Sequence, residues 1–272
     1  MIETRGLGKA YDGVSALRGL DWTVGEGEWW GIIGPNGSGK STLMRLLSGV
    51  ERPSSGTIRI RGRHVEDYGR KELSRMMAVL QQEGIMPVHY PVREVLEMGR
   101  HPYLNWLGQD MREDVGALID GIMEKLELQG LADRHLDELS GGQRQRVALG
   151  QVMAQEPQIL LLDEPTTFLD IHYQQQFMEL VAEWRKEAGI TVVAVLHDLN
   201  LAALYCDKLL VLRDGRAVSM GTPEEMLTSE RIRSVYDVEP VIVAHPVYGA
   251  PQVLLSKAAL KRNKEEGNEW VF

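Results

Sequence analysis

One segment constrains the fold of this chain more than any other: residues 34–41 read GPNGSGKS. This matches the pattern G-x-x-x-x-G-K-[ST] at every fixed position. A short apolar stretch ends at Ile33 before it, and a helical pattern that Gly49 can terminate follows it. Glycines let backbone N–H groups approach phosphate oxygens closely, and a helix N-terminus adds partial positive charge. The sequence therefore predicts an α/β protein with a strand, a phosphate-binding P-loop and a helix.

The residue types in this segment predict a site for ATP and Mg²⁺. Lys40 should reach the β- and γ-phosphates, and the Ser41 hydroxyl should be a ligand of Mg²⁺. The other predicted nucleotide-binding residues of the loop are Gly34, Pro35, Asn36, Gly37, Ser38, Gly39 and Thr42. The alternative, a chance glycine-rich turn, would not require the strand and the helix that flank it.

Two acids follow a second apolar run, in which residues 158–165 read QILLLDEP. A continuous apolar run indicates a buried parallel strand, and ligands gather at the carboxyl ends of such strands. Asp163 fits an indirect or water-mediated partner of Mg²⁺. Glu164 fits a group that orients or deprotonates the attacking water. The alternative is a pair of solvated acids after a strand.

Two more strand ends carry candidate polar groups. His197 follows the apolar run ITVVAVL, so its imidazole could contact the γ-phosphate, although a lone histidine can also be purely structural. Gln82 follows the apolar stretch MAVL and could contact Mg²⁺ and water. Gln81 is the neighbouring candidate, and spacing alone does not choose between the two glutamines.

Tyr11 is the candidate for stacking on adenine. An aromatic face contributes about 1–3 kcal/mol to the binding of a base. The alternative is an ordinary tyrosine in a strand.

A second glycine-rich loop, LSGGQ, spans residues 139–143. The binding of one nucleotide does not evidently require two phosphate-binding loops so far apart in sequence. After Gln143 we expect a helix to about Gln155, because Pro157 cannot continue it.

The composition restricts the partners of the chain. A net charge of −9 argues against broad nucleic-acid binding, which needs a basic surface, so no nucleic-acid partner is expected. The single cysteine, Cys206, excludes an intrachain disulfide. The N-terminal residues lack an apolar signal region, and the apolar runs are too short to span a bilayer. Any membrane attachment is therefore expected through other chains.

Together these motifs resemble those of one family, the ATP-binding subunits of ABC transporters. GPNGSGKST resembles the Walker A motif, LSGGQ the family signature, ILLLDE the Walker B motif and TTFLD the D-loop. The resemblance covers residues 2–221, with the motifs in the order of the family. It implies that Gln82 is the Q-loop glutamine, His197 the H-loop histidine and Tyr11 the A-loop aromatic residue. Asp170 would be the D-loop aspartate that couples two sites.

The resemblance implies a fold and an explanation for the second loop. The expected fold is an ABC-type P-loop ATPase core at residues 1–221, with an N-terminal antiparallel β subdomain and a helical subdomain inserted at about 91–150. Residues 222–272 would be a C-terminal extension. Two copies would meet head to tail, so that each ATP lies between the phosphate loop of one copy and the signature of the other. The signature residues that would bind the partner's γ-phosphate are Ser140, Gly141, Gly142 and Gln143.

Further partners and a subfamily also come from the resemblance. The subunit would dock on two integral-membrane permease subunits at the cytoplasmic face of the membrane, and indirectly serve an extracytoplasmic substrate-binding protein. Residues 92–108 and 221–254 resemble the subfamily that imports iron–siderophore complexes, haem and cobalamin. An ABC transporter for another cargo and a soluble mechanochemical ABC ATPase are the alternatives. The insertion between the two glycine-rich loops lacks the sustained heptads of the mechanochemical class.

The sequence departs from the family pattern at two places. Thr167 and Phe168 stand in the D-loop where a pair such as Ser-Ala is common. Gly150 stands in the signature helix where alanine is usual, at an expected cost of about 0.5–1 kcal/mol. Neither change removes a catalytic group.

Overall fold

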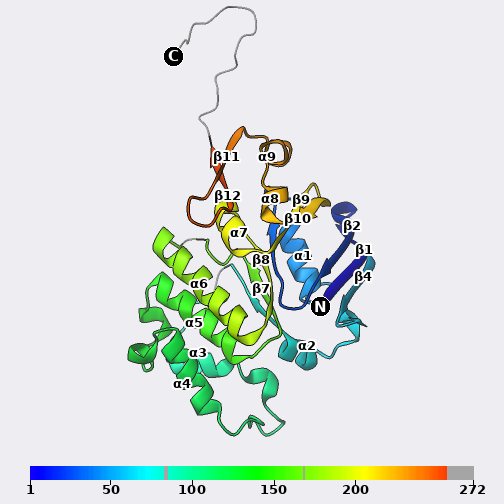
Figure 1. The fold of residues 1–272 in the computed structure, drawn as a ribbon. Helices are drawn as coiled ribbons and strands as arrows, with labels where there is room; N and C mark the ends of the chain where they lie inside the picture. The colour runs from blue at the N-terminus through cyan, green and yellow to red at the C-terminus, as the bar shows by residue number, and fades with distance from the viewer. Residues whose placement is uncertain (83–84, 168, 256–272) are drawn as a thin grey trace, which may run out of the picture.

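The computed structural model describes residues 1–82, 85–167 and 169–255, and a six-stranded sheet forms its centre (Figure 1). The strand order is β10-β9-β3-β8-β7-β6. The strands from β9 to β6 run parallel, and β10 pairs antiparallel with β9 at the edge. The bounds are β3 Trp29–Ile33, β6 Met77–Leu80, β7 Ile159–Asp163, β8 Thr191–Val195, β9 Lys208–Arg213 and β10 Arg216–Gly221. The predicted mainly parallel sheet is confirmed.

A second sheet, antiparallel and built from N-terminal residues, packs beside the first. Its order is β2-β1-β4-β5, and its bounds are β1 Ile2–Tyr11, β2 Val14–Val24, β4 Ser55–Ile60 and β5 Arg63–His64. Trp22 of this sheet meets Trp30 of β3 edge to face, with ring centroids 5.3 Å apart. Such aromatic contacts add to the burial of apolar area between the sheets. The predicted N-terminal antiparallel part is therefore present.

Strand β7 is buried on both faces, which explains its continuous apolar sequence. Leu160 and Leu162 belong to one hydrophobic cluster, whereas Ile159 and Leu161 belong to another. The second cluster lies between the two sheets and includes helix α1, Lys40–Leu47. Successive side chains of a strand point to opposite faces, so a strand with a core on each side has no polar face.

Helices α5 and α6 cover the other face of the central sheet, and α3 and α4 pack against α5. Figure 1 shows α3, α4, α5 and α6 on one side of the molecule. Their bounds are α3 Val92–Met98, α4 Val115–Lys125, α5 Gly141–Ala154 and α6 Ile171–Ala188. Besides α1, the other described helices are α2 Arg70–Met76, α7 Leu199–Tyr205, α8 Pro223–Met226 and α9 Ser229–Tyr236. Among the described residues, no helix has both the length and the apolar composition needed to cross a bilayer.

The region expected to form a helical subdomain, at about 91–150, is interrupted between its first two helices. Between α3 and α4 the chain forms only a short 3₁₀ turn, η2 at His101–Tyr103, followed by an irregular segment. Arg100 explains the interruption, because its buried guanidinium binds Asp110 and Glu156 and donates to a backbone carbonyl. A buried guanidinium needs several acceptors, and a continued helix would not bring them together. The other 3₁₀ turns are η1 Val65–Asp67, η3 Gln129–Leu131 and η4 Leu136–Glu138.

Helices α3 and α5 cross closely because small residues stand at the crossing. A Cβ atom on Gly99, the C-cap of α3, would lie 2.1 Å from the carbonyl oxygen of Gln151. A Cβ atom on Gly150 would lie 2.9 Å from Leu126 Cδ1 and 3.2 Å from Leu96 Cγ. The departure from alanine at position 150 therefore serves packing, which helix propensity alone does not reveal.

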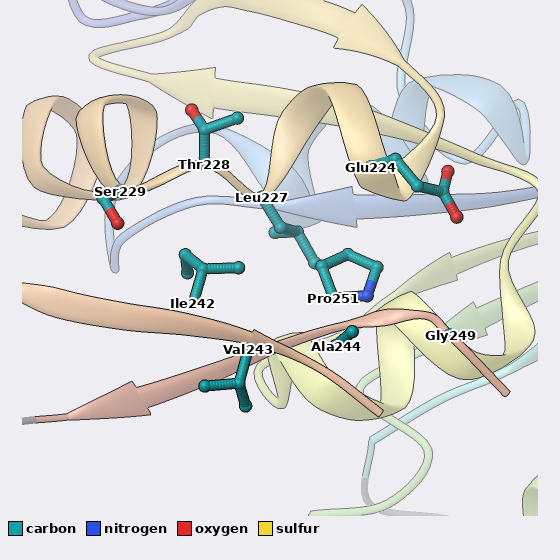
Figure 2. Close-up of a pocket in the computed structure, with 9 residues that line it drawn as sticks. All are labelled: Glu224, Leu227, Thr228, Ser229, Ile242, Val243, Ala244, Gly249 and Pro251. Carbon is teal, nitrogen blue, oxygen red and sulfur yellow. The ribbon is translucent and has the colours of Figure 1, made fainter. Parts of the chain in front are cut away.

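The chain after β10 forms a small layer against α7 and β9. Strands β11 Pro240–Ala244 and β12 Pro251–Leu255 pair as an antiparallel hairpin beside α8 and α9. A cavity of about 360 Å³ opens between the hairpin and these helices, and Figure 2 shows Leu227, Ile242 and Pro251 at its apolar lining. This cavity is formed by the C-terminal layer, not by the ends of the central strands.

Candidate functional site

The carboxyl ends of the central strands gather the predicted site residues at one edge of the sheet. The phosphate loop follows β3, Asp163 ends β7, and His197 follows β8 after one buried leucine. These strands are neighbours in the order β3-β8-β7. Parallel strands present their carboxyl ends at the same edge, so residues that are far apart in sequence meet there.

Two glycines of the phosphate loop are fixed by backbone contacts with other strands. Gly34 has φ 151°, and a Cβ atom there would lie 2.1 Å from the carbonyl oxygen of Leu212. Gly39 has φ 100°, and a Cβ atom there would lie 2.6 Å from the carbonyl oxygen of Ala16. Only glycine fits both the conformation and the space. Strands β9 and β2 therefore determine the position of the loop.

The turn between β9 and β10 contacts the phosphate loop through its backbone. Asp214 and Gly215 have φ values of 51° and 74°, so both residues of this hairpin turn are left-handed. The backbone N–H of Gly215 donates to the carbonyl of Ser38. Ser38 is buried, and its hydroxyl has no partner.

Lys40 is the first residue of α1, and its ammonium lies inside the loop. It is 5% exposed, and its Nζ donates to the carbonyls of Gly34 at 2.9 Å and Pro35 at 3.0 Å. Burial lowers the pKa of Lys40, while the carboxylates of Glu164 and Asp163 act in the opposite direction. The arrangement places a cation within the curve of the loop, where phosphate oxygens would be neutralised.

Asp163 and Glu164 differ in environment although they are adjacent. Burial, and then the charge of Glu164, raise the pKa of Asp163. The Oδ1 atom of Asp163 is buried without a hydrogen-bond partner. An unpaired buried carboxylate oxygen is costly, and a bound cation would offset that cost.

Glu164 and His197 form a direct pair. His197 Nε2 lies 2.6 Å from Glu164 Oε1. Glu164 has φ 51°, an uncommon conformation for a residue with a side chain, and its N–H donates to the carbonyl of Val195. Backbone strain of this kind is concentrated at functional sites. The structure thus brings together the two side chains predicted as base and phosphate contact.

The residues present fit a Mg²⁺ site that is completed by phosphates. The candidate oxygens are the Ser41 hydroxyl, the Gln82 amide and the buried Asp163 carboxylate. In the described part of the chain, His, Cys, Asp and Glu form no cluster of three that could hold a metal alone. Mg²⁺ commonly takes one or two protein ligands together with water and substrate phosphates.

Both glutamine candidates lie at the same edge of the central sheet, directly after β6. Gln81 and Gln82 are both exposed after β6, and Leu80 of that strand pairs with Leu162 of β7. Either side chain therefore starts beside the Asp163–Glu164 edge. The assignment of Gln82 as the Mg²⁺ and water contact stays a prediction.

Tyr11 lies at the end of β1 and is 37% exposed. Its hydroxyl donates to Glu51, and this hydrogen bond is the main reason for the lowered pKa of that carboxyl group. Lys9 Nζ lies 5.1 Å from the centroid of the Tyr11 ring. These contacts hold the ring near the start of β2, although its stacking on adenine stays a prediction.

The second glycine-rich loop forms the first turn of α5, which begins at Gly141 and so three residues earlier than predicted. Ser140 is the N-cap, its Oγ accepts from the N–H of Gln143, and the Gln143 side chain accepts from the N–H of Ser140. This reciprocal capping box explains the early start. The N–H groups of Gly141 and Gly142 have no acceptor within the helix, as is usual in a first turn. They therefore point along the axis of α5 as donors for an anion.

Within one chain, the second loop contacts the D-loop region rather than the phosphate loop. Gly142 is buried against Tyr173 of α6, and Gln145 donates to the carbonyl of Pro165. Among the described residues, no hydrogen bond or ion pair joins residues 139–143 to residues 34–42. Asp170 is exposed and is the N-cap of α6, and Phe168 lies outside the described residues. Sequence reasoning did not single out Tyr173, because no motif marks it.

The C-terminal layer also reaches the phosphate loop. Tyr236 is the last residue of α9, and burial raises its pKa to about 12, while the nearby backbone of Gly34 acts in the opposite direction. Arg213 of β9 donates to the carbonyl of Ser234 and pairs with Asp237. The first glycine of the loop is thus contacted from both β9 and α9.

Comparison with known proteins places these features in a family. Residues 17–167 match the model of the ABC transporter family. The chain is 40% identical over 251 residues to the ferric enterobactin transport ATP-binding protein FepC of Escherichia coli, covering 92% of this chain and 91% of that protein. It is 41% identical over 245 residues to the hemin import ATP-binding protein HmuV of Streptomyces coelicolor, covering 90% of this chain and 86% of that protein.

Two further similar proteins are a longer relative and a protein of known structure. An uncharacterized ABC transporter ATP-binding protein of Bacillus subtilis, YvrA, is 37% identical over 96% of this chain, which spans 60% of that protein. The dimeric structure of MJ0796, a bacterial ABC transporter cassette, is similar with a TM-score of 0.71 at 28% identity, over 82% of this chain and 98% of that one. The site geometry, the family match and these identities lead to one conclusion: the chain belongs to the ABC transporter family.

Proposed function

We propose that the chain is the ATP-hydrolysing subunit of an ABC importer that takes up an iron complex. The observation that carries the ATPase proposal is the pairing of Glu164 with His197 beside the phosphate loop and the unpaired oxygen of Asp163. Relatives named for ferric enterobactin and hemin support the cargo class. A related chelate such as cobalamin belongs to the same proposal.

In the proposed reaction the chain positions a water against the γ-phosphate of ATP. Lys40 and the N–H groups of the loop hold the phosphates, and Glu164 accepts the proton of the attacking water. His197 holds the Glu164 carboxylate and faces the γ-phosphate. Mg²⁺, bound through Ser41, Gln82 and Asp163, would neutralise charge on the phosphates when present.

The second glycine-rich loop would complete the site of another copy. Two chains would meet head to tail, and Ser140, Gly141, Gly142 and Gln143 of one would bind the γ-phosphate held by the other. Shifting such a dimer from mostly open to mostly closed takes about 5.5 kcal/mol of differential binding. A few charge-assisted hydrogen bonds, at about 1.5–3 kcal/mol each, can supply this. Loss of the γ-phosphate by hydrolysis would reopen the dimer.

The remaining partners follow from the importer proposal. The dimer would attach to two integral-membrane permease subunits at the cytoplasmic face of the membrane, and a substrate-binding protein outside would deliver the cargo. Residues 1–221 would be the ATPase domain, with a helical subdomain at about 91–150, and residues 222–272 a C-terminal extension. Of that extension, residues 256–272 lie outside the described structure.

Uptake of labelled compounds in a deletion strain tests the cargo. Ferric siderophores, haem and cobalamin are supplied separately, and the deletion is complemented with the wild-type chain or with Lys40→Ala. We expect uptake of one compound to require the wild-type chain and to fail with the variant. If uptake of all three is unchanged by the deletion, another cargo must be sought. If Glu164→Gln and Lys40→Ala retain normal ATP hydrolysis, the ATPase assignment is wrong as well.

A soluble mechanochemical ABC ATPase is the remaining alternative. It would not copurify with membrane proteins. Recovery of the chain with a detergent-solubilised permease would exclude it.

A further inference from the structure

The ring of Tyr173 occupies the space beside the Cα atom of Gly142. A Cβ atom on Gly142 would lie 2.6 Å from Cδ1, 2.7 Å from Cε1 and 2.8 Å from Cγ of this tyrosine. Gly142 is buried, whereas Gly141 before it is exposed with open space around it. The absence of a side chain at position 142 is thus required by packing within the chain, before any nucleotide is considered.

The same turn of α6 holds the D-loop segment. The Asp170 carboxylate accepts from the N–H of Tyr173 at 3.0 Å. Gln174 Nε2 donates to the carbonyls of Thr166 and Leu169, at 3.2 and 3.0 Å. Tyr173 therefore lies against the signature turn, and the residue after it on the same helix turn, Gln174, holds the backbone of Thr166 and Leu169.

A hydrogen bond from α5 strengthens this connection. Gln145 Nε2 donates to the carbonyl of Pro165 at 2.9 Å. The remaining void next to Gly142, Leu169 and Tyr173 measures about 10 Å³, which is near the lower limit for one water molecule. Because close-packed groups transmit displacements, a shift of the ring would move the signature turn and the D-loop segment together.

We propose that Tyr173 is a positioning residue that sets the signature turn relative to the D-loop, and so acts on the ATP held by the partner copy. This inference rests on the proposed head-to-tail dimer. Among the described residues, no hydrogen bond joins Tyr173 to the phosphate loop of its own chain. The contact is made by ring carbons, so phenylalanine should replace it, whereas alanine should let the signature turn shift toward α6.

The test measures ATP-driven dimerisation in the Glu164→Gln background, where hydrolysis cannot reopen the dimer. Tyr173→Ala should weaken ATP-driven dimerisation at least about tenfold, measured by sedimentation across a concentration series. The affinity for ADP should change by less than about twofold, because ADP is held by the phosphate loop alone. Unchanged ADP binding also shows that the variant is folded.

Two matched variants separate positioning from general loss of packing. Tyr173→Phe should dimerise as the parent does, because it keeps the ring. Gln175→Ala changes an exposed neighbour on the same turn, whose side chain donates to Glu179, and should also behave as the parent. The proposal is overturned if Tyr173→Ala dimerises like the parent, or if Tyr173→Phe is as defective as alanine.

A double-mutant cycle tests the contact itself. Gly142→Ala should weaken ATP-driven dimerisation when Tyr173 is present, and this effect should become smaller when Tyr173 is alanine. Additive effects would contradict the packing argument. If the parent with Glu164→Gln forms no ATP-dependent dimer, then the proposed function fails and the inference fails with it. A dimerising parent with additive variants defeats the inference alone.

Discussion

The two glycine-rich loops of this molecule offer backbone N–H groups to phosphates in different ways. The first loop is enclosed: Gly34 and Gly39 lie against carbonyls of β9 and β2, and Lys40 is buried within it. The second loop is presented: Ser140 and Gly141 are exposed at the start of α5. The first loop is held by the backbone of β9, of β2 and of the turn between β9 and β10. The second loop is held by its own capping box and by the ring of Tyr173.

This difference shows how one chain can carry two nucleotide half-sites that are not equivalent. An enclosed loop can bind a nucleotide by itself, since its groups are already oriented. A presented helix turn adds binding only when another surface brings an anion to it. The first loop should therefore control affinity for any nucleotide, and the second should control only what depends on the γ-phosphate and the dimer.

Glu164→Gln should have the largest effect. It removes the proposed base while keeping the shape of the side chain. Turnover should fall by about 10²–10⁴-fold, measured as phosphate release under saturating ATP. ATP should still bind, and the dimer should accumulate on a sizing column. Normal turnover in this variant would show that another group accepts the proton.

Lys40→Ala tests the enclosed loop. The affinity for ATP and for ADP should both fall, by about 10–150-fold, because at least one charge-assisted hydrogen bond of about 1.5–3 kcal/mol is lost. Titration calorimetry with each nucleotide measures the change. A loss confined to ATP would mean that the two loops are less different than their structures indicate.

Ser140→Ala tests the second loop, and the expected pattern is the reverse of that for Lys40→Ala. ADP affinity should be unchanged, while ATP-driven dimerisation weakens about tenfold or more. Loss of the N-cap should also lower the free energy of unfolding by about 1 kcal/mol, which urea denaturation detects. Reduced ADP binding would place Ser140 at the nucleotide of its own chain.

Asp163→Asn should raise the stability of the nucleotide-free protein. The pKa of Asp163 is raised in the folded state by burial and by Glu164, so ionisation at neutral pH opposes folding. The contribution of this carboxyl to stability is present below its unfolded pKa of about 4 and is lost as the pH rises through the folded value. The variant should therefore melt a few degrees higher at pH 7 and equally near pH 4. A lower melting temperature at pH 7 would contradict this.

Gly150→Ala should have the smallest effect, away from both loops. Alanine would gain about 0.5–1 kcal/mol in helix propensity, but overpacking against the buried Leu96 and Leu126 costs about 1–3 kcal/mol. We expect a net destabilisation of about 0.5–2 kcal/mol in urea denaturation, with ATP and ADP affinity unchanged. Stabilisation would mean that the two leucines move aside.

The parts of the fold that depend on local pattern could be predicted from the sequence. The strand containing Leu160 and the turn at Asp214–Gly215 follow from apolar runs and turn residues. The interruption after α3 could not be predicted, because it depends on the distant acceptors of Arg100 at Asp110 and Glu156.

The site shows the same division. The edge that collects Asp163, Glu164 and His197 follows from strand ends and their spacing. The early start of α5 was readable in principle, since Ser140 and Gln143 form a capping-box pattern. The contact of Tyr173 with Gly142 joins two different helices, so the local sequence of neither helix predicts it.

The proximity of Tyr236 to the backbone of Gly34 gives the C-terminal layer a role in the geometry of the first motif. A protein shortened after the hairpin of β9 and β10 would keep every recognised motif. It would nevertheless lose one of the two supports of the residue at which the phosphate loop begins. A shortened ATPase made from this chain should therefore keep α9. A molecule that displaces α9 would remove this contact and so alter the phosphate loop where the nucleotide is expected to bind.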